Sequence, residues 1–170
     1  MDGLRSKRRE HVSEPEGQFS HLDRSGRVRM VDVSKKRSTR RRADARCTVF
    51  TSADLFDGGN DASSLTSVHA ARLAGIMAAK QTASLIPLCH PINLHDVQIS
   101  VTPSVNGVEV NATVVTVHRT GVEMEALTAC AVAAISLVTS LLEIDPFARM
   151  DGLVITRKSG GKSADWGLQA

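Results

Sequence analysis

Two carboxylates at the start of an apolar stretch are the residues of this sequence best suited to chemistry. Glu123 and Glu125 flank Met124, and residues 126–142 then follow with almost no polar side chains. In a helix, residues two positions apart in the sequence lie about 200° apart around the axis. The two carboxylates therefore do not face each other as a catalytic pair. Glu123 also has a structural interpretation, because Thr120 and Glu123 have the spacing of a capping box.

A histidine in a proline-restricted segment is the second candidate. His90 lies between Cys89 and Pro91, and Pro87 restricts the same segment. An imidazole held in such a loop can act as a general acid or base near neutral pH, although a lone histidine is more often structural. No further metal-ligand spacing accompanies Cys89 and His90, so we expect no metal site. The chain has three cysteines without CxxC spacing, which argues against a disulfide framework and indicates a reducing compartment.

The third candidate is a glycine-rich basic segment near the C-terminus, Lys158-Ser-Gly-Gly-Lys162-Ser163. It is not a P-loop, because Thr156 stands where that motif needs its first glycine and too little chain follows for the required helix. Two lysines on such a loop can still bind an anion together with backbone amides. A solvated C-terminal loop explains the same residues equally well.

Two helices are expected to position these residues. Residues 120–142 lack glycine and proline after Gly121 and are rich in alanine and leucine, which predicts a long helix buried on nearly every side. This stretch contains four hydroxyl residues and its apolar part is shorter than the roughly 20 residues that span a bilayer, so we favour a core or interface helix over a membrane span. Residues 67–83 predict a second helix, in which Gly75 allows close packing.

Strands are predicted where apolar residues alternate, over residues 94–102 and 108–117, with a hairpin turn at Asn106-Gly107. Shorter strands are expected near Val31, over 48–50 and over 153–156. The basic run at residues 35–42 is expected on the surface between the first two. This mixture predicts the α+β class, with an antiparallel sheet that has helices packed on one face.

Length and charge limit the remaining possibilities. With 170 residues we expect a single domain over residues 29–166, a flexible basic and polar tail over 1–28 and a short tail over 167–170. Residues 1–46 hold 14 Lys and Arg against 7 Asp and Glu, but aromatic residues make up only 3%, so a nucleic-acid partner is not expected. The first residues lack the apolar region of a secretory signal, so we expect a cytoplasmic protein without a membrane partner.

Five segments taken together are more specific than any one of them: MVDVS, LAGIMAAK, LIPLCHP, TGVEMEALTA and KSGGKS. In this order they resemble the molybdenum cofactor biosynthesis protein C (MoaC) family, the cyclic pyranopterin monophosphate synthases. The resemblance implies a ferredoxin-like subunit in a homohexamer, a trimer of dimers, with active sites between subunits. It implies conversion of (8S)-3′,8-cyclo-7,8-dihydroguanosine 5′-triphosphate to cyclic pyranopterin monophosphate with release of diphosphate, without a cofactor.

The resemblance also assigns site residues. It implies that Lys158 and His90 are catalytic, and that the purine nucleotide or pterin substrate contacts Leu88, Cys89, His90, Glu123, Met124, Glu125, Arg41 and Lys162.

Three departures from the family pattern are visible. Thr139 stands at the usual catalytic aspartate, Leu142 at a usual lysine, and Ser64 begins the segment where the family has Lys-Gly-Asp-Val. Threonine carries no carboxylate charge, and leucine cannot neutralise phosphate. The alternative is therefore a catalytically impaired paralogue that serves as a nucleotide-binding, pterin-binding or structural subunit.

Overall fold

A computed structural model describes residues 21–23, 25–53, 62–161 and 165–168, without the side chains of residues 62–64. The chain divides into two compact units, Met1–Val31 and Asp32–Ala170. The described part of the first unit is a turn, in which Leu22 and Val28 form an antiparallel bridge. The predictions for residues 1–20 and for Lys162 lie outside the described residues.

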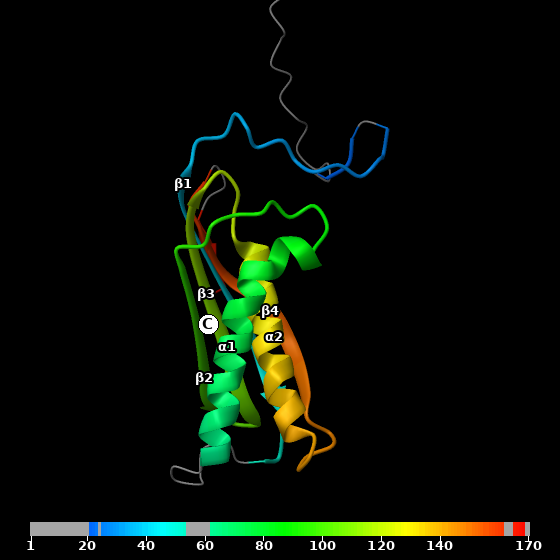
Figure 1. The fold of residues 1–170 in the computed structure, drawn as a ribbon, viewed down its shortest axis with the longest axis vertical. Helices are drawn as coiled ribbons and strands as arrows, with labels where there is room; N and C mark the ends of the chain where they lie inside the picture. Colours follow the sequence, from blue (N-terminus) through cyan, green and yellow to red (C-terminus); the bar gives the residue numbers. More distant parts are fainter. Residues whose placement is uncertain (1–20, 24, 54–61, 162–164, 169–170) are drawn as a thin grey trace, which may run out of the picture. The chain divides into compact units, whose positions relative to one another are not determined.

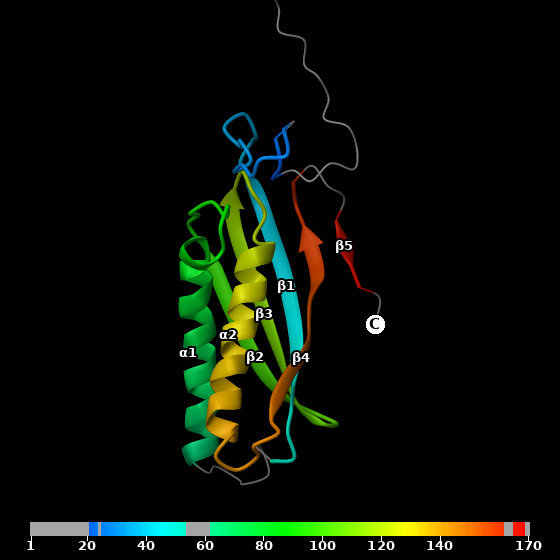
Figure 2. The same cartoon turned by 90° about the vertical axis from the view of Figure 1, so that its right-hand side faces the viewer.

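The second unit is an antiparallel sheet with two helices on one face (Figures 1 and 2). The strand order in the sheet is β2-β3-β1-β4-β5. A βαββαβ chain with this order is ferredoxin-like, which confirms the predicted α+β class. The elements are β1 (Thr39–Phe50), α1 (Ala62–Leu85), β2 (Asp96–Ser104), β3 (Gly107–His118), α2 (Glu123–Leu141), β4 (Arg149–Ser159) and β5 (Trp166–Gly167).

The first strand corrects the sequence prediction at its N-terminal side. The chain forms no strand at Val31, and β1 instead runs through the basic segment that was expected to lie between two short strands. The reason is a two-residue alternation: small apolar residues from Ala43 to Val49 are buried against the helices, while Arg42 and Arg46 lie on the other face. Alanine and cysteine made this alternation weak in the sequence.

The predicted hairpin is confirmed, with its turn one residue earlier than expected. Ser104 and Gly107 are the last paired residues, so Val105 and Asn106 form the turn. Gly107 has a φ of 141°, and a Cβ there would lie 2.2 Å from the carbonyl oxygen of Val49. A side chain at this position is therefore excluded both by the backbone conformation and by the neighbouring strand.

The long apolar helix is explained by packing within this fold. The helix α2 packs against α1 on one side and against β1, β3 and β4 of the sheet on another, and its buried residues include Ala129, Ala133 and Leu137. By length and composition it could also cross a membrane, but a core helix passes the same test. Gly75 of α1 makes the predicted close contact, because a Cβ there would lie 2.9 Å from the carbonyl oxygen of Ala129.

Candidate functional site

Two neighbouring strands, β1 and β4, carry basic side chains toward the helices at one end of the sheet. In the register of the sheet, Arg41 of β1 is opposite Thr116 of β3, and Ala43 of β1 is opposite Lys158 of β4. Ala43 and Thr116 are buried under the helices, and opposed residues share a face, so Arg41 and Lys158 point to that side. This is the end at which α2 begins (Figure 2).

The start of α2 brings Glu123 to Lys158. The N-cap of α2 is Val122, and no side chain caps the helix, so the predicted capping box of Thr120 with Glu123 is wrong. The Glu123 carboxylate instead forms an ion pair with the Lys158 ammonium, and these side chains are 22% and 24% exposed. A carboxylate forms a charge-assisted hydrogen bond with either an ammonium or a helix-end amide, and in this fold the partner is the ammonium of the strand β4.

Glu125 has a different environment although it is only two residues away. Its side chain is buried, with 5% of its surface exposed. Burial raises the pKa of this carboxyl from 4.5 to about 7, its own backbone N–H lowers the pKa in part, and the charge of Glu123 raises it further. The expected separation of the two acids is confirmed: Glu123 is ion-paired, while Glu125 can take up or release a proton near neutral pH. Met124 between them is exposed.

The loop after α1 carries the histidine segment. Leu88 adopts a left-handed backbone conformation with a φ of 68°, which is strained for a residue with a branched side chain. Burial, and then the nearby Glu125, raise the pKa of the Cys89 thiol, so it is protonated at neutral pH. The end of the loop is fixed to β3, because the Thr116 hydroxyl donates to the Asn93 carbonyl at 2.6 Å. The loop therefore holds Cys89 near Glu125 of α2 and His90 near His118 of β3.

The glycine-rich segment packs against the strand that carries Arg41. A Cβ at Gly161 would lie 2.1 Å from Nη1 of Arg41, and a Cβ at Gly160 would lie 2.1 Å from the carbonyl oxygen of Arg40. Both glycines also have positive φ. Only glycine allows this approach, so Gly160 and Gly161 form a wall of the site. Lys158 itself belongs to β4.

The positions that depart from the family pattern lie at the opposite end of the helices. The Thr139 hydroxyl donates to the Ile135 carbonyl at 2.9 Å within α2. Leu142, the C-cap of α2, is 48% exposed. Since Glu125 and Thr139 are about four turns apart, they are separated by about 21 Å along the helix. Ser64 lies in the first turn of α1, and the two helices are antiparallel (Figure 2), so these three positions share one end.

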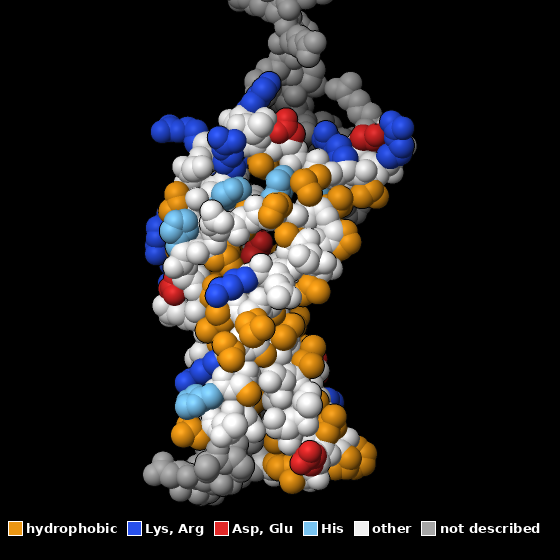
Figure 3. Space-filling view, in the orientation of Figure 1, with side chains coloured by type: hydrophobic (Ala, Val, Ile, Leu, Met, Phe, Trp, Pro, Cys, Tyr) orange, Lys and Arg blue, Asp and Glu red, His pale blue; other side chains and the backbone are white. Residues whose placement is uncertain are grey.

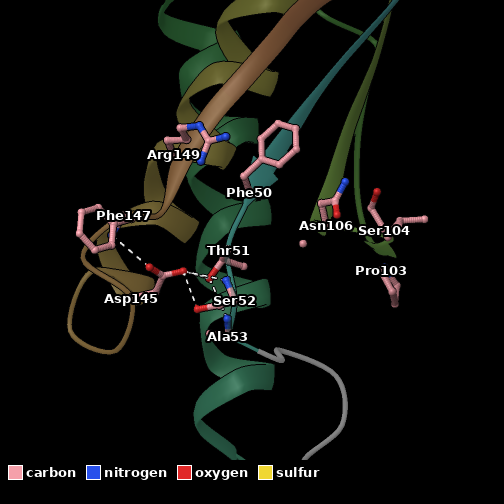
Figure 4. Close-up of a pocket in the computed structure, with 12 residues that line it drawn as sticks. Phe50, Thr51, Ser52, Ala53, Pro103, Ser104, Asn106, Asp145, Phe147 and Arg149 are labelled. Atoms are coloured by element: carbon pink, nitrogen blue, oxygen red, sulfur yellow. Dashed lines mark hydrogen bonds between the residues drawn. The ribbon is translucent and has the colours of Figure 1, made fainter.

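A hollow of about 870 Å³ also lies at that opposite end (Figure 4). The Asp145 carboxylate beside it accepts hydrogen bonds from the Thr51 hydroxyl and from the Ser52 and Phe147 amides. These bonds, that from the Ser52 amide first, lower the pKa of Asp145. The Arg149 guanidinium stacks on the Phe50 ring at 4.8 Å. The Asp145 carboxylate is thus engaged by its neighbours, and none of the predicted site residues lines this hollow.

Two residues of the basic end were missed by the sequence analysis, His118 and Arg119. His118 is the last residue of β3 and Arg119 follows it, and the Arg119 carbonyl accepts a hydrogen bond from Nη2 of Arg41 at 3.3 Å. Extending the two-residue alternation of β3 from Val114 through Thr116 would have placed His118 on the helix side. No group of three or more potential metal ligands occurs among the described residues.

Comparison with known proteins identifies the relatives of this chain. The MoaC family model matches residues 30–161. The cyclic pyranopterin monophosphate synthase of Chloroflexus aggregans is 45% identical over 88% of this chain and 93% of its own length. The synthase of the same name from Streptomyces coelicolor is 41% identical over 90% of this chain and 91% of its own length. That of Desulforapulum autotrophicum is 45% identical over 85% of this chain and 91% of its own length.

Proposed function

The chain belongs to the MoaC family, and from this premise we propose that it acts in molybdenum cofactor biosynthesis. The proposed reaction converts (8S)-3′,8-cyclo-7,8-dihydroguanosine 5′-triphosphate to cyclic pyranopterin monophosphate, with release of diphosphate as the cyclic phosphate closes. The observation that carries this proposal is the identity of 45% to a cyclic pyranopterin monophosphate synthase over 88% of the chain. The likeness extends over nearly the full length of both proteins, which supports a shared activity as well as a shared fold.

The basic residues of the site suit the triphosphate. Arg41 and Lys158 lie on the same face of adjacent strands, and the glycine-rich segment closes beside them. Charge-assisted hydrogen bonds of this kind contribute roughly 1.5–3 kcal/mol each. We assign Lys158 to stabilising negative charge on the phosphates while diphosphate leaves, with Glu123 holding its ammonium in position and Lys162 as a further phosphate ligand.

The carboxyl and imidazole groups suit the rearrangement of the purine. Glu125 has a pKa of about 7, so it can accept and return a proton without a large free-energy change at neutral pH. We assign proton transfer to Glu125 and His90, and contact with the base to Leu88, Cys89 and Met124. The half-buried loop and the buried Glu125 would shield the reacting atoms from water.

We also propose that the active unit is a homohexamer, a trimer of dimers, in the cytoplasm. Large apolar side chains remain exposed on the two helices of one subunit, among them Leu73, Met77 and Ile135. Hydrophobic side chains gather over α1 and α2 in Figure 3. Exposed apolar patches of this kind are typical of subunit interfaces. The proposed cytoplasmic location is supported by the free thiols of the three cysteines, which are typical of a reducing compartment. Light scattering on the purified protein would test the assembly, and a monomer at micromolar concentration would refute it.

Incubation of the purified protein with the cyclised GTP precursor tests the reaction. Stoichiometric diphosphate and cyclic pyranopterin monophosphate are the expected products. The matched control is Lys158→Ala, which removes the proposed phosphate ligand and should slow the formation of both products by about 100-fold or more. If the unchanged protein forms neither product while it is correctly assembled, the synthase proposal is wrong.

A second candidate, the catalytically impaired paralogue, is favoured by one observation. The Thr139 hydroxyl is engaged with the Ile135 carbonyl and Leu142 is apolar, so neither position supplies the carboxylate or the ammonium of the family pattern. Such a protein would bind nucleotide or pterin, or form part of an assembly, without turnover. The triple variant with Ser64→Lys, Thr139→Asp and Leu142→Lys should then gain activity that the unchanged protein lacks. Turnover by the unchanged protein at a rate the triple variant does not exceed would exclude this candidate.

A further inference from the structure

His118 is a side chain of the basic end to which the proposed reaction gives no role. It is the last residue of β3, is paired with Thr39 of β1, and is half-buried. By alternation from the buried Thr116 it lies on the helix side of the sheet, the side on which Arg41 also lies. The ring is therefore at the edge of the site rather than on the open face of the sheet.

The surroundings of His118 are cationic on several elements. Arg41 of β1, His90 of the loop and Arg119 beyond β3 all interact with the ring electrostatically. Burial first, and then these three neighbours, lower the pKa of His118 from 6.5, so the imidazole is neutral near pH 7. The other charged side chains of this end are Lys158 of β4 and the two glutamates of α2, with Lys158 paired to Glu123.

The two ring nitrogens of His118 are not equivalent. Nδ1 is buried and has no hydrogen-bond partner among the described residues. Because Nδ1 is enclosed, only Nε2 can reach a ligand. Toward a phosphate oxygen, which only accepts hydrogen bonds, the neutral ring must carry its proton on Nε2.

Arg41 has a matching feature. Its Nε is also buried without a partner among the described residues, while Nη2 donates to the Arg119 carbonyl at 3.3 Å. The guanidinium is thus held by one hydrogen bond and by the contact with Gly161, and it forms no ion pair with a carboxylate among the described residues. The guanidinium groups of Arg41 and Arg119, beside the neutral imidazole of His118, form an arrangement that suits the oxygens of a phosphate chain.

We propose that His118 is a further substrate-binding residue, whose Nε2–H donates to a phosphate oxygen of the substrate while Arg41 and Arg119 neutralise the charge of the same phosphates. This inference rests on the proposed function, and it adds the residue and its chemical form. His118 acts as a neutral donor, not as a cation or as a general acid. The chemistry that it recognises is a diphosphate or triphosphate chain.

Amide replacements of His118 provide a sharp test. In His118→Gln the side-chain amide can occupy the place of Nε2–H, whereas in His118→Asn the amide reaches only the place of Nδ1. We expect His118→Ala and His118→Asn to weaken diphosphate binding about tenfold or more in calorimetry, and His118→Gln to stay within about threefold of the unchanged protein. With the cyclised precursor as substrate, KM should rise in the same order while kcat changes little.

The controls separate binding from folding and from the reaction. His69 is exposed on α1, so His69→Ala is the matched removal of a histidine elsewhere and should leave diphosphate binding unchanged. Thermal melting identifies any variant that fails to fold. Equal binding by the folded Gln and Asn variants, or rescue by His118→Lys but not by Gln, would overturn the neutral-donor role.

The inference and the proposed function can fail separately. Diphosphate binding that depends on His118, in a protein that forms no product, would support the inference and refute the synthase reaction. Normal turnover with an unchanged KM in His118→Ala would refute the inference and leave the reaction standing.

Discussion

Lys158, near the end of β4, forms an ion pair with Glu123, the first residue of α2. The pair joins the last long strand to the start of the helix, and it keeps the ammonium beside Arg41 on the helix side of the sheet. The carboxylate therefore positions a cation instead of capping its own helix. The same relationship leaves Glu125 as the carboxyl group of this end that is free to exchange a proton.

Replacement of Lys158 should separate stability from activity. A partly exposed ion pair contributes at most about 1 kcal/mol to folding, so Lys158→Ala should lower the free energy of unfolding by no more than this. Loss of a cation that stabilises transition-state charge should reduce kcat by about 100-fold or more. Urea titration and a diphosphate-release assay measure the two effects. Lys158→Arg is the control that keeps the charge, and a fully active Lys158→Ala protein would contradict the assigned role.

The raised pKa of Glu125 should appear in the pH dependence of stability. Below pH 4.5 the carboxyl is protonated in both the folded and the unfolded chain, and as the pH rises toward 7 only the unfolded chain ionises it. Stability is therefore lost with rising pH, by about 3 kcal/mol between pH 4.5 and 8 from this group. The free energy of unfolding of Glu125→Gln, measured in urea, should not show this loss. Relative to the unchanged protein, the variant should therefore be more stable at pH 8 than it is at pH 4.5. An identical pH dependence of the two proteins would refute the shift.

The three cysteines should differ in reactivity. Cys47 and Cys130 are buried, with their sulfur atoms 3.4 Å apart, while Cys89 is partly exposed. A thiol-modifying reagent should label one cysteine in the native protein and three after unfolding in urea. Labelling of Cys89 should be slow at pH 7, because burial and Glu125 raise its pKa. Cys89→Ser should abolish the native reaction, and two or more labelled thiols in the native protein would contradict the buried pair.

The substitution Gly75→Ala has two opposed effects on stability, a gain in helix propensity and a steric clash with α2. Alanine favours a helix over glycine by up to about 1 kcal/mol. At this position its Cβ would lie 2.9 Å from the Ala129 carbonyl oxygen, a backbone atom that cannot move aside alone. We expect the clash to dominate and to destabilise the fold by about 1–3 kcal/mol, measured by thermal or urea unfolding. A Gly75→Ala protein more stable than the original would show that the helices separate easily.

The sequence by itself determined the elements whose signals are local. Helix-forming residues without glycine or proline predicted α2, two-residue alternation with an Asn-Gly turn predicted the β2–β3 hairpin, and the family motifs predicted the ferredoxin-like class. Each of these signals depends on neighbours a few residues away. The strand β1 was only partly predicted, because its buried residues are small and its exposed residues are charged.

Only the tertiary structure decided how the residues of the basic end are used. The sequence could not distinguish whether Glu123 caps its helix or pairs with Lys158, because the partner strand lies far along the chain. It could not reveal that Glu125 is buried while Glu123 forms an ion pair with Lys158. Nor could it reveal that the His118 ring interacts with Arg41. Burial and ion pairing depend on which surfaces meet in the folded chain, and those long-range contacts set the pKa and the role of each group.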